Sequence, residues 1–131
     1  MSDAPSSHWA NAYVGRPWIA GEAECWDFAR DVWRERFGLE VPAVQKAFHD
    51  PRLARHLCER HEERGSWLLV PVPAEGDAVL MARGMRPCHV GVHVAPDAVL
   101  HAVEGAGGLC TPLSRLADLG YRVDGFYRRA G

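Results

Sequence analysis

Apolar residues recur at three- and four-residue intervals between Cys25 and Phe37, and polar or charged residues fill the positions between them. That spacing places the apolar side chains on one face of a helix. Gly38 follows directly and suits the C-terminal cap, so the pattern predicts an amphipathic helix over 25–37. The residues expected on its apolar face are Trp26, Phe28, Ala29, Val32, Trp33 and Phe37.

The other predicted elements are shorter, with helices before residue 66 and mostly strands after it. Ser6 or Ser7 is the expected cap of the first helix. A glycine-rich stretch at 105–108 favours a turn. The expected elements are a helix at 7–14, helices opening at Pro42 and Pro51, strands at 67–71, 77–82, 90–94 and 98–103, a helix at 113–119 and a strand at 121–128.

Helices first and strands afterwards predict an α+β fold class, in which N-terminal helices pack on one side of a small antiparallel β-sheet. The chain has 131 residues and 47% apolar composition, which suits one domain spanning residues 1–131. Within that domain, we expect a helical insertion at about 43–66.

The net charge of −2 gives no electrostatic case for binding nucleic acid or an anionic membrane. No apolar run approaches the roughly 20 residues of a membrane-spanning helix. Residues 1–7 lack the basic and apolar stretches of a secretion signal. We therefore expect synthesis in the cytoplasm without a signal peptide.

Cys25 stands where a polar, glycine-bearing loop gives way to the predicted helix. A thiol at the first turn of a helix lies at the positive end of the helix dipole, which favours the thiolate. His89 and His101 lie in neighbouring predicted strands and can supply a base and a group that orients the base. A loop centred on Ala95 would set the two histidines directly opposite one another, although the sequence leaves this register open.

Each of these residues also has an ordinary structural interpretation. A lone cysteine at a helix start usually fills a core, and a lone strand histidine is usually a hydrogen-bonded structural residue. The order and placement of all three together favour catalysis. We expect His93 to be partly exposed. We expect Cys58, Cys88 and Cys110 to be thiols that fill the core, because no disulfide pattern is visible.

Metal binding is an alternative for the same histidines. Structural zinc sites normally use closely spaced cysteine or histidine pairs. The histidine pair at 89 and 93 lies in a strand, and the pair at 56 and 61 lies in a charged helix where exposure is the default. We therefore expect no metal and no other cofactor. The conceivable ligand set is Cys88, His89, His93 and His101.

Three residues near Cys25 are candidates for substrate binding. Glu24 precedes the thiol and either favours the helix terminus electrostatically or holds an amine of the substrate. Trp18 lies in the preceding loop and either lines the cleft or packs in the core. Trp26 follows the thiol and lies on the apolar face of the helix.

Five ordered segments resemble the NlpC-type cell-wall cysteine peptidases, a compact papain-like family. The resemblance covers most of the chain except about 43–70. Many family members read Asp-Cys-Ser-Gly at the nucleophile, whereas this chain has Glu24 and Trp26 around Cys25, and Trp18 replaces the usual tyrosine. The segments are Tyr13-Val-Gly-Arg-Pro-Trp18, Cys25-Trp-Asp-Phe-Ala, Pro73-Ala-Glu-Gly-Asp77, His89-Val-Gly-Val-His93 and Val99-Leu-His101-Ala.

The resemblance implies a cysteine peptidase that hydrolyses peptidoglycan stem peptides at the bond between D-isoglutamate and the diamino acid. It implies Cys25 as nucleophile, His89 as base and His101 as the residue that orients the base. Glu24 would hold the amine of the peptide, and the backbone N–H of Cys25 would help to bind the oxyanion.

The Cys25-Trp26 pair and the C-terminal segment 125–128 resemble the family branch encoded with bacteriophage tail genes. That branch implies a virion tail-tip location, with tail-tip or hub proteins as partners, so that the virion carries the protein to the wall. Two alternatives remain open. One is a structural or assembly component of a tail tip with a closed or inactive cleft, and the other is acyl-transfer or thioester chemistry on the same fold.

Overall fold

The computed structural model describes residues 8–19, 25–41, 67–83 and 86–129, without the side chains of 86–88. The helical insertion expected at 43–66, Glu24, Cys58 and the side chain of Cys88 lie outside the described residues. Expectations for them stay predictions.

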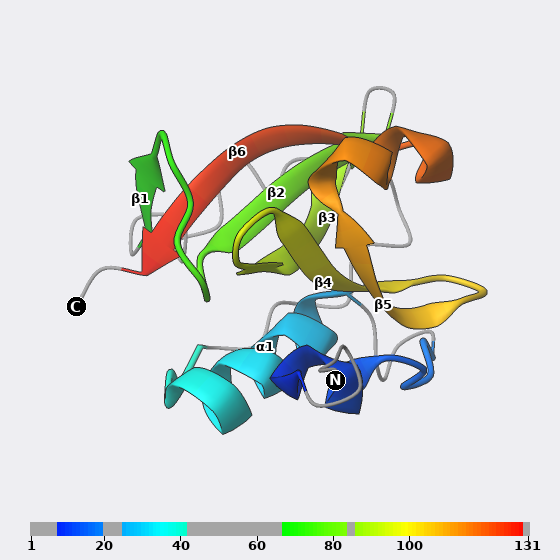
Figure 1. The fold of residues 1–131 in the computed structure, drawn as a ribbon, viewed down its shortest axis with the longest axis horizontal. Coiled ribbons are helices and arrows are strands. Elements are labelled where there is room, and N and C mark those ends of the chain that lie inside the picture. Colours follow the sequence, from blue (N-terminus) through cyan, green and yellow to red (C-terminus); the bar gives the residue numbers. More distant parts are fainter. Residues whose placement is uncertain (1–7, 20–24, 42–66, 84–85, 130–131) are drawn as a thin grey trace, which may run out of the picture.

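Six strands form one sheet in which every neighbouring pair is antiparallel, in the order β1-β6-β2-β3-β4-β5 (Figure 1). Strands β2 to β5 follow one another as a meander, and β6 returns between β1 and β2. The predicted α+β class is confirmed. The bounds are β1 (Trp67–Val70), β2 (Ala78–Arg83), β3 (Arg86–Val94), β4 (Ala98–Val103), β5 (Gly107–Pro112) and β6 (Arg122–Arg129).

The predicted helix over 25–37 is confirmed as α1 (Cys25–Phe37). Gly38 ends it with φ of 68°, the left-handed conformation that glycine adopts readily after a helix, and Leu39 N donates to Trp33 O at 3.0 Å. α1 packs against β3 and β4 through its apolar face. The buried residues that join helix and sheet include Phe28, Ala29, Val32, Trp33, Val90, Val92, Leu100 and Ala102.

The 3₁₀-helix η4 (Leu113–Leu119) covers the face of the sheet opposite α1, as Figure 1 shows. Its Leu116 is buried against Val79, Met81 and Val99. The N-terminal helix α1 packs on one side of the sheet as predicted, and the later helix η4 covers the other side. The reason is that β2 and β4 carry apolar residues at successive positions, so both faces of these strands need cover. None of the described helices is long and apolar enough to cross a membrane.

The first helix differs from the prediction in type and cap. It is the 3₁₀-helix η2 (Trp9–Tyr13), and its cap is His8 rather than Ser6 or Ser7. The amide of Ala10 donates to His8 Nδ1 at 3.1 Å. A histidine ring nitrogen, rather than a serine hydroxyl, is therefore the acceptor that caps this helix.

Strand β5 was not predicted, because its first two residues belong to the glycine-rich stretch at 105–108, which favours a turn. Gly15 N donates to Gly108 O at 2.9 Å, and Gly108 N donates to Arg16 O at 2.8 Å. A Cβ on Gly107 would overlap Arg16 O, and one on Gly108 would overlap Tyr13 O. The glycines therefore let the loop after η2 lie directly on β5.

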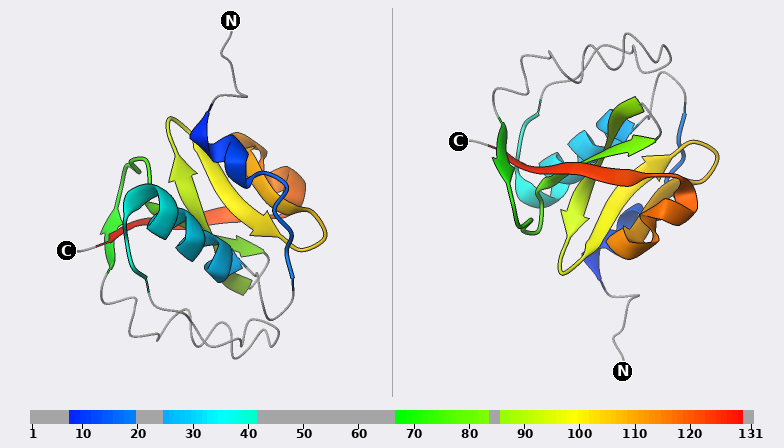
Figure 2. Two further views of the ribbon diagram at one scale, coloured as in Figure 1. Left: turned by 90° about the horizontal axis from the view of Figure 1, so that it is seen from below. Right: turned by 90° about the horizontal axis from the view of Figure 1, so that it is seen from above.

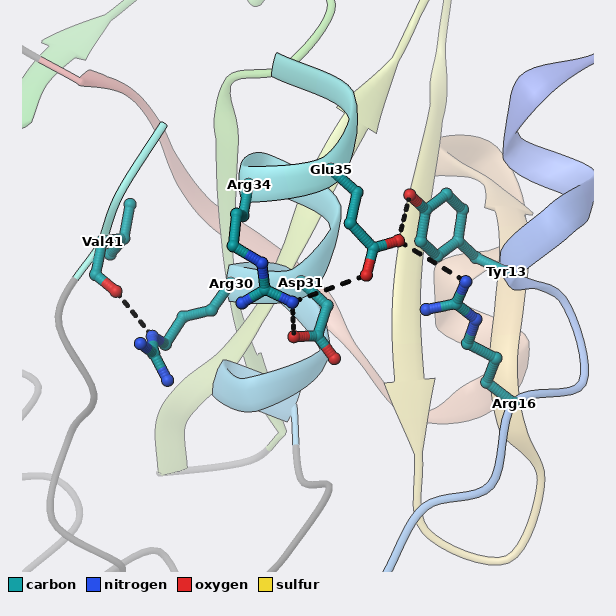
Figure 3. Close-up of polar contacts among 7 residues, drawn as sticks. All are labelled: Tyr13, Arg16, Arg30, Asp31, Arg34, Glu35 and Val41. Carbon is teal, nitrogen blue, oxygen red and sulfur yellow. Dashed lines mark hydrogen bonds and ion pairs between the residues drawn. The ribbon is translucent and has the colours of Figure 1, made fainter. Parts of the chain in front are cut away.

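The polar face of α1 is also as predicted, and it ties neighbouring segments to the helix (Figure 3). Tyr13 Oη donates to Glu35 Oε1 at 3.0 Å, and Arg16 lies 3.6 Å from the same carboxylate. Burial and then the Glu35 carboxylate raise the pKa of Tyr13. On the other side of the helix, Arg30 Nε donates to the carbonyl of Val41.

Candidate active site

His89 on β3 and His101 on β4 are hydrogen-bonded to each other, with 2.8 Å between His89 Nε2 and His101 Nδ1. Their ring planes cross at 69° with centroids 5.1 Å apart. A hydrogen bond between two imidazoles needs one proton between the two nitrogens, so one ring donates and the other accepts. The structure thus brings the two histidines of the sequence prediction together.

The two histidines do not face each other directly, because the register that the sequence left open is not the one centred on Ala95. Val92 pairs with Leu100 and Val94 with Ala98, so the hairpin is centred on Pro96 rather than Ala95. Continuing this register sets Gly91 across from His101 and leaves His89 on the diagonal.

Gly91 makes the diagonal contact possible. A Cβ at this position would lie 3.0 Å from His101 Cβ and 2.5 Å from Val99 Cγ2. The side chain of His101 therefore lies close to where the Cβ of any other residue at position 91 would have to be. The absence of that Cβ lets His101 reach His89. The sequence alone does not indicate this role of Gly91, because a single glycine in a strand more often marks a bulge.

His101 is fully buried and both of its ring nitrogens have partners. Nδ1 is bonded to His89, and Nε2 lies 3.0 Å from Thr111 Oγ1 on β5. Burial lowers the pKa of His101 to about 4, because the charged ring would lose its hydration. His101 is therefore neutral at pH 7.

His89 is partly buried, and its pKa is lowered well below the usual value. Burial is the largest cause, followed by the cost of placing a second positive charge beside His101 and by the positive charge of Arg83. A neutral imidazole at pH 7 has one ring nitrogen with an open lone pair. Nε2 is committed to His101, so Nδ1 is the nitrogen that remains for another partner.

Tyr121 packs on His89, a contact that no pattern along the sequence predicts. The two rings are parallel within 9° and their centroids are 4.3 Å apart. Arg83 lies over the same tyrosine ring, with its Cζ 4.4 Å from the centroid, and its Nη2 donates to Leu119 O at 2.7 Å. Tyr121 thereby covers one face of the His89 ring and limits its rotation.

Cys25 is the first residue of α1 and is 6% exposed. Figure 2 shows α1 running along β3 in the same direction, so its first turn lies at the end of the sheet where β3 begins. Cys25 belongs to the core on the α1 side, whereas His89 and Tyr121 lie on the side of Met81. Cys25 therefore reaches this end of the sheet from the other face.

An electrostatic effect links the thiol to the histidine side of the sheet. Burial raises the pKa of Tyr121, Arg83 lowers it, and the charge of a Cys25 thiolate raises it again. The thiol is thus close enough for its charge to act on the ring that stacks on His89.

Trp18 and Trp26 are half-buried and pack against the core under α1. Trp26 lies edge-to-face with Trp33, with centroids 5.7 Å apart. Their contacts agree with the core interpretation, and a role in substrate binding stays a prediction. Glu24 is outside the described residues.

Two expectations about neighbouring residues are wrong. His93 is fully buried rather than partly exposed, and its Nδ1 donates to Ala74 O at 3.1 Å. Its neighbours Gly76 and Asp77 also bond to the His93 backbone, which anchors this part of β3. Cys110 is exposed rather than a core residue, because β5 is an edge strand and position 110 points away from η4 and the buried Thr111.

Within the described ranges, no group of three or more His, Cys, Asp or Glu side chains is arranged to hold a metal ion. The arrangement instead offers acid–base chemistry: a neutral histidine with one nitrogen anchored, a second histidine behind it, and a thiol at a helix N-terminus. Neither protein-family models nor curated protein sequences give a match to this chain.

Proposed function

We propose that this chain is a papain-like cysteine peptidase of the NlpC type that hydrolyses peptidoglycan stem peptides. The observation that carries the proposal is the 2.8 Å hydrogen bond between His89 Nε2 and His101 Nδ1. It fixes the ring of His89 and leaves Nδ1 as the nitrogen that can take a proton from Cys25. The lowered pKa of His89 keeps that nitrogen unprotonated at pH 7, as a general base requires.

In the proposed reaction, His89 Nδ1 takes the proton of the Cys25 thiol, and the sulfur attacks the carbonyl carbon of the scissile amide. The backbone N–H of Cys25, at the first turn of α1, donates to the oxyanion. His89 then gives the proton to the leaving amine as the C–N bond breaks, which leaves an acyl thioester. Water, deprotonated by His89, hydrolyses the thioester and restores the thiol.

Proton transfer requires Cys25 Sγ and His89 Nδ1 to come within hydrogen-bond distance of each other. Cys25 is in the first turn of α1, at the end of the sheet where β3 begins, and His89 is near the start of β3. His89 stacks on Tyr121, and the charge of a Cys25 thiolate raises the pKa of the same tyrosine. Hydrogen bonds of catalytic groups often tighten only when substrate is bound. In this proposal, substrate binding at that end of the sheet completes the contact between thiol and base.

The substrate class rests on the resemblance described from the sequence. The order of the three residues, on a helix and then on two adjacent strands, agrees with it. The proposed bond is the one between D-isoglutamate and the diamino acid, with Glu24, Trp18 and Trp26 as substrate contacts. We further propose that the protein acts at a phage tail tip, alongside tail-tip or hub proteins.

The decisive experiment is mass spectrometry of soluble peptides released from purified peptidoglycan. Native protein and a Cys110→Ala control, in which an exposed thiol on β5 is removed, are expected to release the same stem-peptide fragments. The Cys25→Ala variant is expected to release none. Equal release by Cys25→Ala would exclude the proposed nucleophile.

Two further results would redirect the proposal. If the native protein released no peptide from walls of several chemical types, a structural or assembly role in a tail tip would replace hydrolysis. If the products carried an added amine in place of water, the same acyl thioester would be serving acyl transfer.

A further inference from the structure

His101 is the middle member of a buried chain of hydrogen bonds that begins at His89 and ends at Thr111. Its pKa of about 4 makes it neutral at pH 7, so it carries one N–H and one open lone pair. Both nitrogens have partners, so the ring must donate on one side and accept on the other. The hydrogen bonds from His89 through His101 to Thr111 therefore all donate in the same direction.

Only one direction leaves His89 able to act as the proposed base. If His101 Nε2–H donates to Thr111 Oγ1, then His101 Nδ1 accepts from His89 Nε2–H, and the lone pair of His89 is at Nδ1. If Thr111 donates instead, His101 carries its proton on Nδ1 and gives it to His89 Nε2. His89 then holds its own proton on Nδ1, where it would need to receive one from the thiol.

The position of Thr111 is tightly fixed. It pairs with Val99 across β4 and β5 and is 9% exposed. The β-branched side chain has few accessible rotamers, which limits where the hydroxyl can lie. Gly108 anchors β5 to the loop after η2 through two backbone hydrogen bonds. The oxygen is thereby held 3.0 Å from His101 Nε2.

We propose that Thr111 is a positioning residue that sets the direction of this chain: its hydroxyl oxygen accepts from His101 Nε2–H and so places the open lone pair of His89 on Nδ1. The inference rests on the proposed function for its catalytic meaning. The direction of the chain is a property of the folded protein and can be measured without any substrate.

The test of direction is ¹⁵N NMR of the imidazole rings in the full chain at pH 7.5, because two-bond couplings distinguish protonated from unprotonated ring nitrogens. In the native protein, His101 is expected to be protonated on Nε2 and His89 also on Nε2. Thr111→Ser keeps the hydroxyl and should keep both tautomers. Thr111→Val has nearly the same shape without the acceptor and should move the proton of His101 to Nδ1.

The kinetic test uses a synthetic stem peptide. Thr111→Val is expected to lower kcat by about 10- to 100-fold, within the contribution of a general base, with KM changed less than about threefold. Thr111→Ser should stay near the native kcat. A kcat for Thr111→Val equal to that of the native protein would overturn the inference, and so would His101 protonated on Nδ1 in the native protein.

The design separates failure of this inference from failure of the proposed function. If the native protein cleaves no stem peptide but shows the expected tautomers, the function fails and the role of Thr111 in setting the direction stands. If the native protein cleaves the peptide and His101 is protonated on Nδ1, the function stands and this inference fails. Thermal unfolding checks that Thr111→Val is folded. Should it not fold, the native tautomer and the Thr111→Ser comparison still decide.

Discussion

His89 and Tyr121 lie face to face, with ring centroids 4.3 Å apart and planes parallel within 9°. Arg83 also lies over the tyrosine ring, 4.4 Å from its centroid. Two groups at that distance cannot share one face of a ring, so His89 and Arg83 cover opposite faces of Tyr121. The ring of Tyr121 lies between the positive charge of Arg83 and the candidate base His89. Stacking also keeps the imidazole of His89 parallel to the tyrosine ring.

Replacing Tyr121 by leucine should therefore disturb His89 more than replacing it by phenylalanine. Phenylalanine keeps the stacked ring, so activity should stay within about threefold of native, whereas leucine loses a contact worth about 0.5–1.5 kcal/mol and frees the imidazole to rotate. We expect Tyr121→Leu to lower kcat by about tenfold, since misplaced catalytic groups lose rate steeply. Steady-state kinetics on a stem peptide compares the two variants.

Tyr121→Phe also tests the hydroxyl. If Tyr121→Phe lost as much activity as Tyr121→Leu, the phenol hydroxyl would matter and the stacking explanation would be wrong. Equal native-like activity in both variants would show that the ring is not needed to position His89.

The helix at 25–37 and most strands could be predicted because their patterns are local. The period of the apolar residues and Gly38 mark α1, and a short run of mostly apolar residues that follows the Pro96-Asp97 turn signal marks β4. The pairing of His89 with His101 could be predicted only in outline. Moving a register by two residues keeps every side chain on its own face, so alternation cannot distinguish a turn centred on Ala95 from one centred on Pro96.

The rest of the candidate site depends on contacts between distant segments. Thr111 is on β5, a strand that forms because Gly107 and Gly108 admit the loop after η2. Tyr121 reaches His89 because β6 passes beside β2 rather than at the edge of the sheet. Neither the contact of Thr111 with His101 nor that of Tyr121 with His89 can be predicted from the spacing of residues along the sequence.

Gly91→Ala is predicted to disrupt both stability and the histidine pair. The new methyl group would lie 2.5 Å from Val99 Cγ2 and 3.0 Å from His101 Cβ, and no flexible side-chain end is there to yield. Overpacking of this kind costs about 1–3 kcal/mol. We expect urea unfolding to show a loss of that size, and His101 to lose its bond to His89, visible in imidazole NMR.

A double variant separates steric overlap from a general effect of alanine in a strand. Val99→Ala removes the closest atom, so Gly91→Ala combined with Val99→Ala should be more stable than the sum of the two single losses predicts. Simple additivity would show that the overlap is relieved by backbone movement instead.

The two described thiols should react in the opposite order to their exposure. Cys110 is exposed, but desolvation raises its pKa and no base is proposed for it. Cys25 is 6% exposed, but lies at the N-terminus of α1 with His89 as its proposed base. Iodoacetamide labelling at pH 7, followed by peptide mass spectrometry, should therefore modify Cys25 faster than Cys110.

His89→Gln is the matched variant for this measurement. It should slow labelling of Cys25 and leave Cys110, on the far edge strand, unchanged. Faster labelling of Cys110 in the native protein would argue that Cys25 is an inert core thiol.

Acid should destabilise the fold through His101. Its pKa falls from 6.5 to about 4 on folding, so between these values the unfolded chain binds a proton that the folded protein does not. Stability from the neutral, buried ring is fully present above pH 6.5, declines as the pH falls below it, and is lost by about pH 4. At 1.36 kcal/mol per pKa unit, the loss reaches about 3 kcal/mol.

His101→Gln keeps polar atoms near both partners but does not titrate. We therefore expect its free energy of unfolding, measured in urea at pH 7.5 and pH 4.5, to fall less than that of the native protein, by up to this amount. An equal fall in both proteins would show that His101 is not the group whose protonation drives acid unfolding.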